Sequence, residues 1–171
     1  GGRGEVVNQA IPSFILDSQK KDKPVKHEFD LNHARKQLKP YKGAELTITT
    51  SNTQFLRKTA EMIKEQWEKA GIKVQTEFLA PEQLLEQKIK TRDYQVLIFG
   101  QTLSFEPDPL SFWHSRSKEH PGMNLSLYEN TETDDILEQA RQEMETQKRI
   151  ELYQKTNQII NKDCPAIFLY S

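Results

Sequence analysis

Residues 44–99 alternate between the period of a β-strand and the period of an α-helix, and this alternation constrains the fold more than any other feature. Leu46, Ile48 and Thr50 occupy every second position, as in a strand with one buried face. Residues 56–70 then place apolar side chains at steps of four and three, which predicts a helix with one buried stripe. A glycine follows where a left-handed C-terminal cap is expected.

The same alternation continues downstream. Residues 72–78 alternate again and predict a second strand, and Pro81 opens a short helix that runs to Ile89. Residues 94–99 are apolar apart from Gln95, which is typical of a central strand covered on both faces. The order strand, helix, strand, helix, strand predicts an α/β fold with crossover helices and a mixed, mainly parallel sheet.

The length of 171 residues predicts one lobe rather than several domains. We expect residues 1–43 to be an N-terminal arm with one short helix, part of the same lobe, and residues 44–171 to form the α/β lobe proper. Beyond the third strand we expect two helices and a last strand at 166–170. The expected apolar stripes of these helices are Ile136, Ala140 and Met144 in the first, and Leu152, Thr156 and Ile159 in the second.

Several classes of function are disfavoured. The 24 Lys and Arg residues are balanced by 25 Asp and Glu residues and are scattered among them, which argues against nucleic-acid binding. No phosphate-binding loop, dinucleotide fingerprint or nucleophile elbow occurs, and the single Cys164 cannot build a Cys-rich zinc site. The acidic residues around Asp134 and Glu138 are interpreted as a solvated helix face. We therefore expect no catalytic residues, no metal, no cofactor and no enzyme activity.

The carboxyl ends of the predicted strands indicate a binding site. In open α/β sheets, ligands lie outside these ends, where the loops diverge. Ser51 and Asn52 follow the first strand, and Gly100, Gln101 and Thr102 follow the third. These residues are expected to border one crevice, with the glycine allowing close approach of a ligand.

A series of short motifs then matches a known family. They are Phe29-Asp30, Leu46-Thr-Ile-Thr-Thr, Ala60-Glu-Met-Ile with Gly71-Ile-Lys-Val, Tyr94 to Gly100, Pro107-Asp108-Pro109, Phe112-Trp113-His114-Ser115, Asn124, Tyr128-Glu129-Asn130, Arg149 with Leu152-Tyr153, Asp163-x-Pro165-x-Ile167, and Leu169-Tyr170. In order and spacing, the chain resembles the C-terminal lobe of bacterial extracellular solute-binding proteins of the peptide/nickel class, family 5.

The resemblance implies a lobe of the periplasmic-binding-protein type II kind, cut from a chain about three times as long. Such proteins hold a small solute, often a peptide, between two lobes and deliver it to the permease of an ABC importer. It further implies an extracytoplasmic location, in the periplasm or on the outer face of the membrane, a lipoprotein anchor, a monomer, and the missing first lobe as a partner. Two alternatives remain open: a receptor or sensor of the same fold without a transporter, and a small α/β hydrolase or transferase.

One departure from the family pattern concerns the ligand. In its peptide binders, the corresponding strand usually ends in Gly-Trp, and an Asp soon afterwards pairs with the α-amino group of the peptide. Here Gln101 follows Gly100, and the Asp position falls on Ser104 or Phe105, with Glu106 displaced beside them. The resemblance thus implies that Ser104, Phe105 and Glu106 contact the ligand, without the usual aspartate.

Overall fold

The computed structural model describes residues 6–7, 9–12, 15–16, 29–102 and 108–170. The chain forms two compact units, one of residues 28–102 and one of residues 1–27 with 103–171. We call them the sheet unit and the helical unit and describe each by itself. The division expected at residue 43 does not coincide with theirs, because residues 28–43 are grouped with the sheet.

The sheet unit contains the predicted parallel sheet. Its strands are β1 (Glu45–Ser51), β2 (Lys73–Leu79) and β3 (Val96–Ile98), and β1 pairs in parallel with both others in the order β2-β1-β3. The prediction that residues 94–99 form the central strand is therefore wrong. The first crossover leads from β1 to β2 and the second returns from β2 past β1 to β3, so β1 takes the centre and β3 is a short strand beside it.

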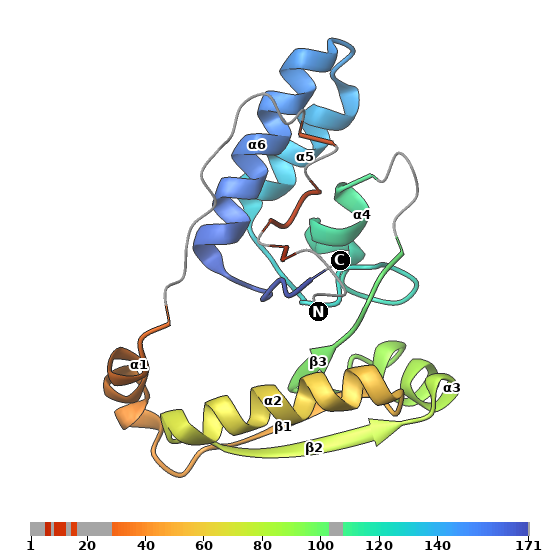
Figure 1. The fold of residues 1–171 in the computed structure, drawn as a ribbon. Coiled ribbons are helices and arrows are strands. Elements are labelled where there is room, and N and C mark those ends of the chain that lie inside the picture. The colour runs from red at the N-terminus through yellow and green to blue at the C-terminus, as the bar shows by residue number, and fades with distance from the viewer. Residues whose placement is uncertain (1–5, 8, 13–14, 17–28, 103–107, 171) are drawn as a thin grey trace. The chain divides into compact units, whose positions relative to one another are not determined.

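Helix α2 (Gln54–Ala70) covers one face of this sheet, as Figure 1 shows. Ile48, Ala60, Val74 and Ile98 form the buried core, and the predicted stripe of Leu56, Ile63 and Trp67 packs against it. Gly71 adopts a left-handed conformation with φ 108°, and its N–H donates to the carbonyls of Glu68 and Trp67. The predicted helix and its glycine cap are confirmed. The strand β1 is more buried than predicted, because Thr49 on the opposite face is covered as well.

Four further elements complete the sheet unit. The predicted arm helix is α1 (Leu31–Leu38), which continues into the 3-10 turn η1 (Lys39–Tyr41). Asp30 caps α1 by accepting a hydrogen bond from the backbone N–H of His33 at 2.9 Å. Between β2 and β3, α3 (Pro81–Gln83) leads into the π-helix η2 (Leu84–Ile89), which buries both of its end residues.

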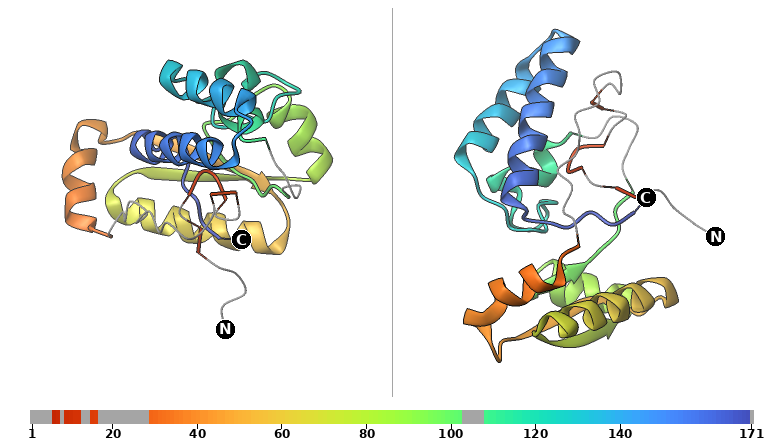
Figure 2. Two further views of the ribbon diagram at one scale, coloured as in Figure 1. Left: turned by 90° about the horizontal axis from the view of Figure 1, so that it is seen from above. Right: turned by 60° about the vertical axis from the view of Figure 1, so that its left-hand side comes forward.

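The helical unit is built on two helices, α5 (Thr131–Gln142) and α6 (Thr146–Asp163), which lie side by side in Figures 1 and 2. They pack with the short elements α4 (Leu110–Trp113) and η3 (Ser115–Ser117). The buried core of this unit consists of Leu110, Trp113, Tyr128, Leu137 and Ile160. The ring of Trp113 meets those of Tyr128 and Phe168 edge-on, at centroid distances of 6.4 and 5.9 Å.

Three expectations for this unit need correction. Met144 lies between the helices and is 91% exposed, because α5 ends at Gln142 and does not extend the stripe. On α6, Ile160 rather than Ile159 is fully buried. Residues 166–170 do not form a strand: within the described chain they make one isolated antiparallel bridge, between Val6 and Tyr170, which is too little pairing for a ladder.

Candidate ligand-binding site

The carboxyl ends of β1 and β3 meet at one edge of the sheet unit. Thr50 pairs with Ile98 in the parallel register, and its hydroxyl donates to the Ile98 carbonyl at 2.8 Å. Ser51 and Asn52 therefore continue from β1 at the same edge at which the chain leaves β3 toward Gly100. Because of this register, the residues that follow β1 and the residues that follow β3 leave the sheet at the same edge, as predicted.

These residues offer polar groups without charge. Asn52, Gly100, Gln101 and Thr102 are exposed. Ser51 is only 7% exposed, and its Oγ has no hydrogen-bond partner among the described residues. A buried hydroxyl without a partner costs free energy, but this oxygen is itself covered and is not presented to a ligand.

The backbone at this edge is accessible too. A Cβ added at Gly100 would meet no atom within 4 Å, so the space beside this residue is open. Helix α2 begins directly after Asn52, and its N-cap Thr53 makes no side-chain capping bond. Uncapped N–H groups of a first turn favour carbonyl or carboxylate oxygens. The strand-end edge can therefore hydrogen-bond a neutral or anionic polar group.

The remaining predicted ligand contacts, Ser104, Phe105 and Glu106, lie outside the described residues. Their contribution to this edge stays a prediction.

A second polar feature of the sheet unit is a hollow of about 620 Å³ lined by side chains of β1, β2 and η2 and by residues 92–95. Lys88 bridges Glu77 and Asp93 across it, at 3.2 and 3.3 Å, and Thr49 donates to Glu77 at 2.9 Å. The hydrogen bond to Glu77 raises the pKa of Lys88. Lys88, Glu77 and Asp93 therefore satisfy one another, and none of these three charges calls for a ligand.

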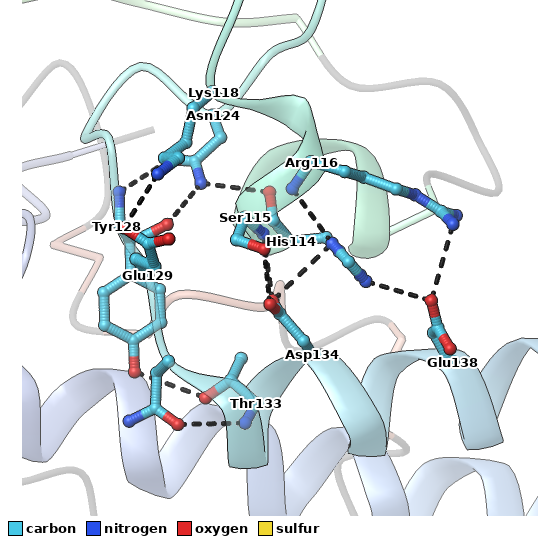
Figure 3. A network of polar contacts seen from close by, with 11 residues as sticks. His114, Ser115, Arg116, Lys118, Asn124, Tyr128, Glu129, Thr133, Asp134 and Glu138 are labelled. Atoms are coloured by element: carbon cyan, nitrogen blue, oxygen red, sulfur yellow. Dashed lines mark hydrogen bonds and ion pairs between the residues drawn. The ribbon is translucent and has the colours of Figure 1, made fainter.

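In the helical unit, a buried histidine network joins η3 to α5 (Figure 3). His114 Nδ1 accepts a hydrogen bond from the Arg116 backbone N–H at 3.1 Å, and Nε2 lies 3.2 Å from Glu138 Oε1. A ring that accepts at Nδ1 has its N–H at Nε2, where it faces Glu138. Asp134 accepts from both the N–H and the hydroxyl of Ser115.

This network corrects the interpretation of Asp134 as part of a solvated helix face, since its side chain is only 16% exposed and anchors the preceding turn. The Ser115 hydroxyl donates to a carboxylate and not to His114, so the arrangement lacks the nucleophile–base pair of hydrolases. Sequence reasoning missed the network because its partners are separated by 19 and 24 positions. The Asp134 and Glu138 spacing of one helical turn was the only local signal.

Beside it, two side chains hold the loop that precedes α5. Asn124 is fully buried, donates to the carbonyls of His114 and Tyr128, and accepts from the Tyr128 N–H. The Tyr128 hydroxyl donates to Asp163 Oδ2 at 2.6 Å and lies 3.2 Å from the Thr133 hydroxyl. Burial and this carboxylate raise the pKa of Tyr128 to about 12, and the same bond lowers the pKa of Asp163.

Within the part of the chain that the structure describes, no group of three or more His, Cys, Asp or Glu side chains could hold a metal ion. No helix there is long and apolar enough to cross a membrane.

Comparison with solved structures defines the class of fold. The oligopeptide-binding protein AppA from Bacillus subtilis, in complex with a nonapeptide, has a TM-score of 0.83 and 25% identity, over 98% of this chain and 36% of that chain. The ABC transporter-associated periplasmic binding protein DppA from Helicobacter pylori, in complex with the peptide STSA, has a TM-score of 0.84 and 25% identity, over 98% of this chain and 33% of that chain. The fold is that of a periplasmic-binding-protein type II-like α/β lobe.

Sequence comparison identifies the family. Residues 1–123 match the model of bacterial extracellular solute-binding proteins, family 5 Middle. The oligopeptide-binding protein AppA of Bacillus subtilis is 30% identical over 131 residues, which are 75% of this chain and 24% of that protein. The chain belongs to the family 5 solute-binding proteins, as its motifs predicted, and it spans about a quarter of the length of this curated relative.

Proposed function

We propose that this chain forms a ligand-binding lobe of an extracytoplasmic protein that captures a peptide or similar small solute for an ABC importer. The observation that carries the proposal is the membership in family 5. Two solved neighbours that align with 98% of the chain are complexes with bound peptides. The permease of the importer and the first lobe of the same protein are the proposed partners, and the protein acts outside the cytoplasm.

The proposed contacts are the residues at the strand-end edge. Ser51 and Asn52 after β1, and Gly100, Gln101 and Thr102 after β3, would hydrogen-bond the polar backbone of a peptide. This assignment is supported by the exposure of Asn52, Gln101 and Thr102 and by the open space beside Gly100. Ser104, Phe105 and Glu106 would extend the same surface, with Phe105 as an apolar wall.

The chemistry of this set implies a preference among peptides. The residues proposed from 51–52 and 100–105 carry no charge, so no carboxylate among them pairs with an α-amino group. Losing a buried ion pair leaves the ligand's charge desolvated and without a partner. We therefore propose that a free α-amino group gives no advantage in binding, with Glu106 as the one residue that could reverse this.

Isothermal titration calorimetry on the full-length natural protein tests the proposal. A peptide that binds and its N-acetylated form are expected to bind with equal affinity, and Gln101→Ala is expected to weaken both. Gln158→Ala, an exposed position on α6, serves as the matched control and should leave affinity unchanged.

Two outcomes would contradict parts of this proposal. A tenfold loss on acetylation, worth about 1.4 kcal/mol, that is matched by Glu106→Gln would show that Glu106 binds the amino group. Failure of the full-length protein to bind any peptide or other small solute would remove the capture function itself.

The enzyme alternative receives no support from the described residues. The family consists of solute-binding proteins, and the Ser115 hydroxyl is bonded to Asp134 rather than to a general base. We propose that the chain has no catalytic activity and needs no cofactor or metal. Turnover of a panel of ester, amide and glycoside substrates by the full-length protein would contradict this.

A further inference from the structure

The sheet unit collects lysines at the edge where β1 and β2 begin, which is the edge opposite to the proposed ligand contacts. Figure 1 shows α1 beside this edge, together with the last turn of α2. The lysines come from α1, from the turn around η1, from the end of α2 and from the first residue of β2. They are all exposed, and we call them the lysine patch: Lys36, Lys39, Lys42, Lys69 and Lys73.

Backbone contacts bring these separate segments together. The guanidinium Nε of Arg35 on α1 donates to the carbonyl of Lys69 at the end of α2, at 2.9 Å. The N–H of Lys73 donates to the carbonyl of Ala44, next to the turn that holds Lys42, at 3.2 Å. Lys36, Lys39 and Lys42 are spaced by three, so they follow one side of α1 and the 3-10 turn.

The lysines of the patch outnumber the carboxylates beside them, which are Glu45, the register partner of Lys73, and Glu68, the neighbour of Lys69. Residues 31–44 contain four Lys and Arg residues and no Asp or Glu, although the whole chain has a formal net charge of -1. None of the five patch lysines has a carboxylate within 4 Å among the described residues. Elsewhere in the described chain, Lys58 and Lys162 also lack an ion pair, whereas six lysines form one: Lys64, Lys88, Lys90, Lys118, Lys148 and Lys155.

Helix stability explains only part of this distribution. Cations near the C-terminal ends of helices complement the helix dipole, which accounts for Lys36 on α1 and Lys69 on α2. Lys42 and Lys73 lie outside both helices and gain nothing from this effect. The surplus of unpaired charge at these positions therefore points to a partner outside the sheet unit.

The aromatic residue within the patch indicates what kind of partner. Tyr41 follows Pro40 in η1, is flanked by Lys39 and Lys42, and is 63% exposed. Exposed tyrosines beside lysines are typical of the interface between a membrane and water, where the ring lies at headgroup level. Lysines are point charges that suit a diffuse layer of lipid phosphates, whereas arginines suit the bidentate recognition of carboxylates.

We propose that the lysine patch docks on an anionic membrane surface, with its ammonium groups facing lipid phosphates and Tyr41 entering the headgroup layer. This interaction goes beyond solute capture. Since the patch occupies the edge opposite to Ser51 and Gly100, docking would leave the proposed ligand contacts of the sheet unit uncovered.

Vesicle sedimentation with the full-length protein, produced without lipid modification, tests the proposal. Vesicles of phosphatidylglycerol and phosphatidylcholine at about 50 mM salt should bind the protein, and pure phosphatidylcholine vesicles should not. Binding should decrease steeply toward about 500 mM salt, as the charges are screened. The variant Lys36→Gln/Lys39→Gln/Lys42→Gln should lower the partition coefficient at least tenfold.

A matched variant distinguishes the effect of the lysine patch from the effect of the net charge of the protein. Lys58→Gln/Lys148→Gln/Lys162→Gln removes three exposed lysines elsewhere and should change the partition coefficient less than twofold. Equal losses in both triple variants, or no binding to anionic vesicles at low salt, would overturn the proposal. Release from the vesicles by polyglutamate at equal charge concentration would favour an acidic protein as the partner instead. Tyr41→Ser should weaken vesicle binding, and peptide affinity should be unchanged in every variant.

Discussion

At the scale of single residues, the bond between Tyr128 and Asp163 ties the loop before α5 to the end of α6. This hydrogen bond, 2.6 Å between its oxygen atoms, joins the hydroxyl of the buried Tyr128 to the exposed carboxylate of Asp163. The lowered pKa of Asp163 means that its contribution to stability is present above the ordinary pKa of an aspartate and is lost as the pH falls through the folded-state value. The pKa of Tyr128 is raised to about 12. The contribution of Tyr128 to stability is therefore present below its ordinary pKa of about 10 and is lost as the pH rises through the folded-state value.

Tyr128→Phe is therefore expected to lower the free energy of unfolding by about 2 kcal/mol at pH 7, the usual range for a hydrogen bond to a charged group. The loss should shrink as the pH falls below the ordinary pKa of an aspartate and through the lowered folded-state pKa, below which Asp163 is protonated in both states. Urea unfolding followed by Trp113 fluorescence, in a Trp67→Phe background, measures it. Tyr153→Phe is the control, since no hydrogen bond of that hydroxyl is found among the described residues, and an equal loss there would contradict the assignment.

At the scale of elements, sequence patterns predict those helices and caps that depend only on residues close together in the chain. Helix α2 and its Gly71 cap follow from apolar spacing and one left-handed position, and both are confirmed. The order of the strands in the sheet depends on pairing between residues far apart in the chain. The apolar run at 94–99 does not report this pairing, and its prediction as the central strand is wrong. The residues after β1 and β3 could be predicted to share an edge because the carboxyl ends of parallel strands lie together. The contact between Ser115 and Asp134 joins residues 19 positions apart, and the spacing of Asp134 and Glu138 was its only local signal.

Trp67→Ala tests how α2 is held on the sheet. Trp67 is half-buried and packs against the core of Ile48, Ala60, Val74 and Ile98. We expect a loss of roughly 2 kcal/mol in the free energy of unfolding, below the 3–5 kcal/mol of a fully buried aromatic residue. Far-UV circular dichroism during urea unfolding measures it. The exposed neighbour Gln66→Ala should change stability by less than about 0.5 kcal/mol, and a Trp67→Ala loss no larger than this would mean that the stripe contributes little.

At the scale of the whole molecule, the extent of the chain limits what it can bind. It covers about a third of each solved neighbour described above and about a quarter of its curated relative in length. Ligand sites normally bury 70–90% of the surface of a small solute. The strand-end edge of the sheet unit presents exposed residues around one buried hydroxyl, which is the surface of one wall rather than an enclosed site.

The 171-residue chain alone should therefore bind a peptide at least 100-fold more weakly than the full-length protein, a difference of about 2.8 kcal/mol at 1.4 kcal/mol per tenfold. Removing one wall exposes apolar ligand surface to water and deprives the ligand's polar groups of their partners, so both the hydrophobic and the hydrogen-bond contributions decrease. Calorimetric titration of both proteins with the same peptide gives the ratio, once circular dichroism has shown that the shorter chain is folded. Equal affinities would locate the whole site within these 171 residues and would contradict a cleft shared with the rest of the protein.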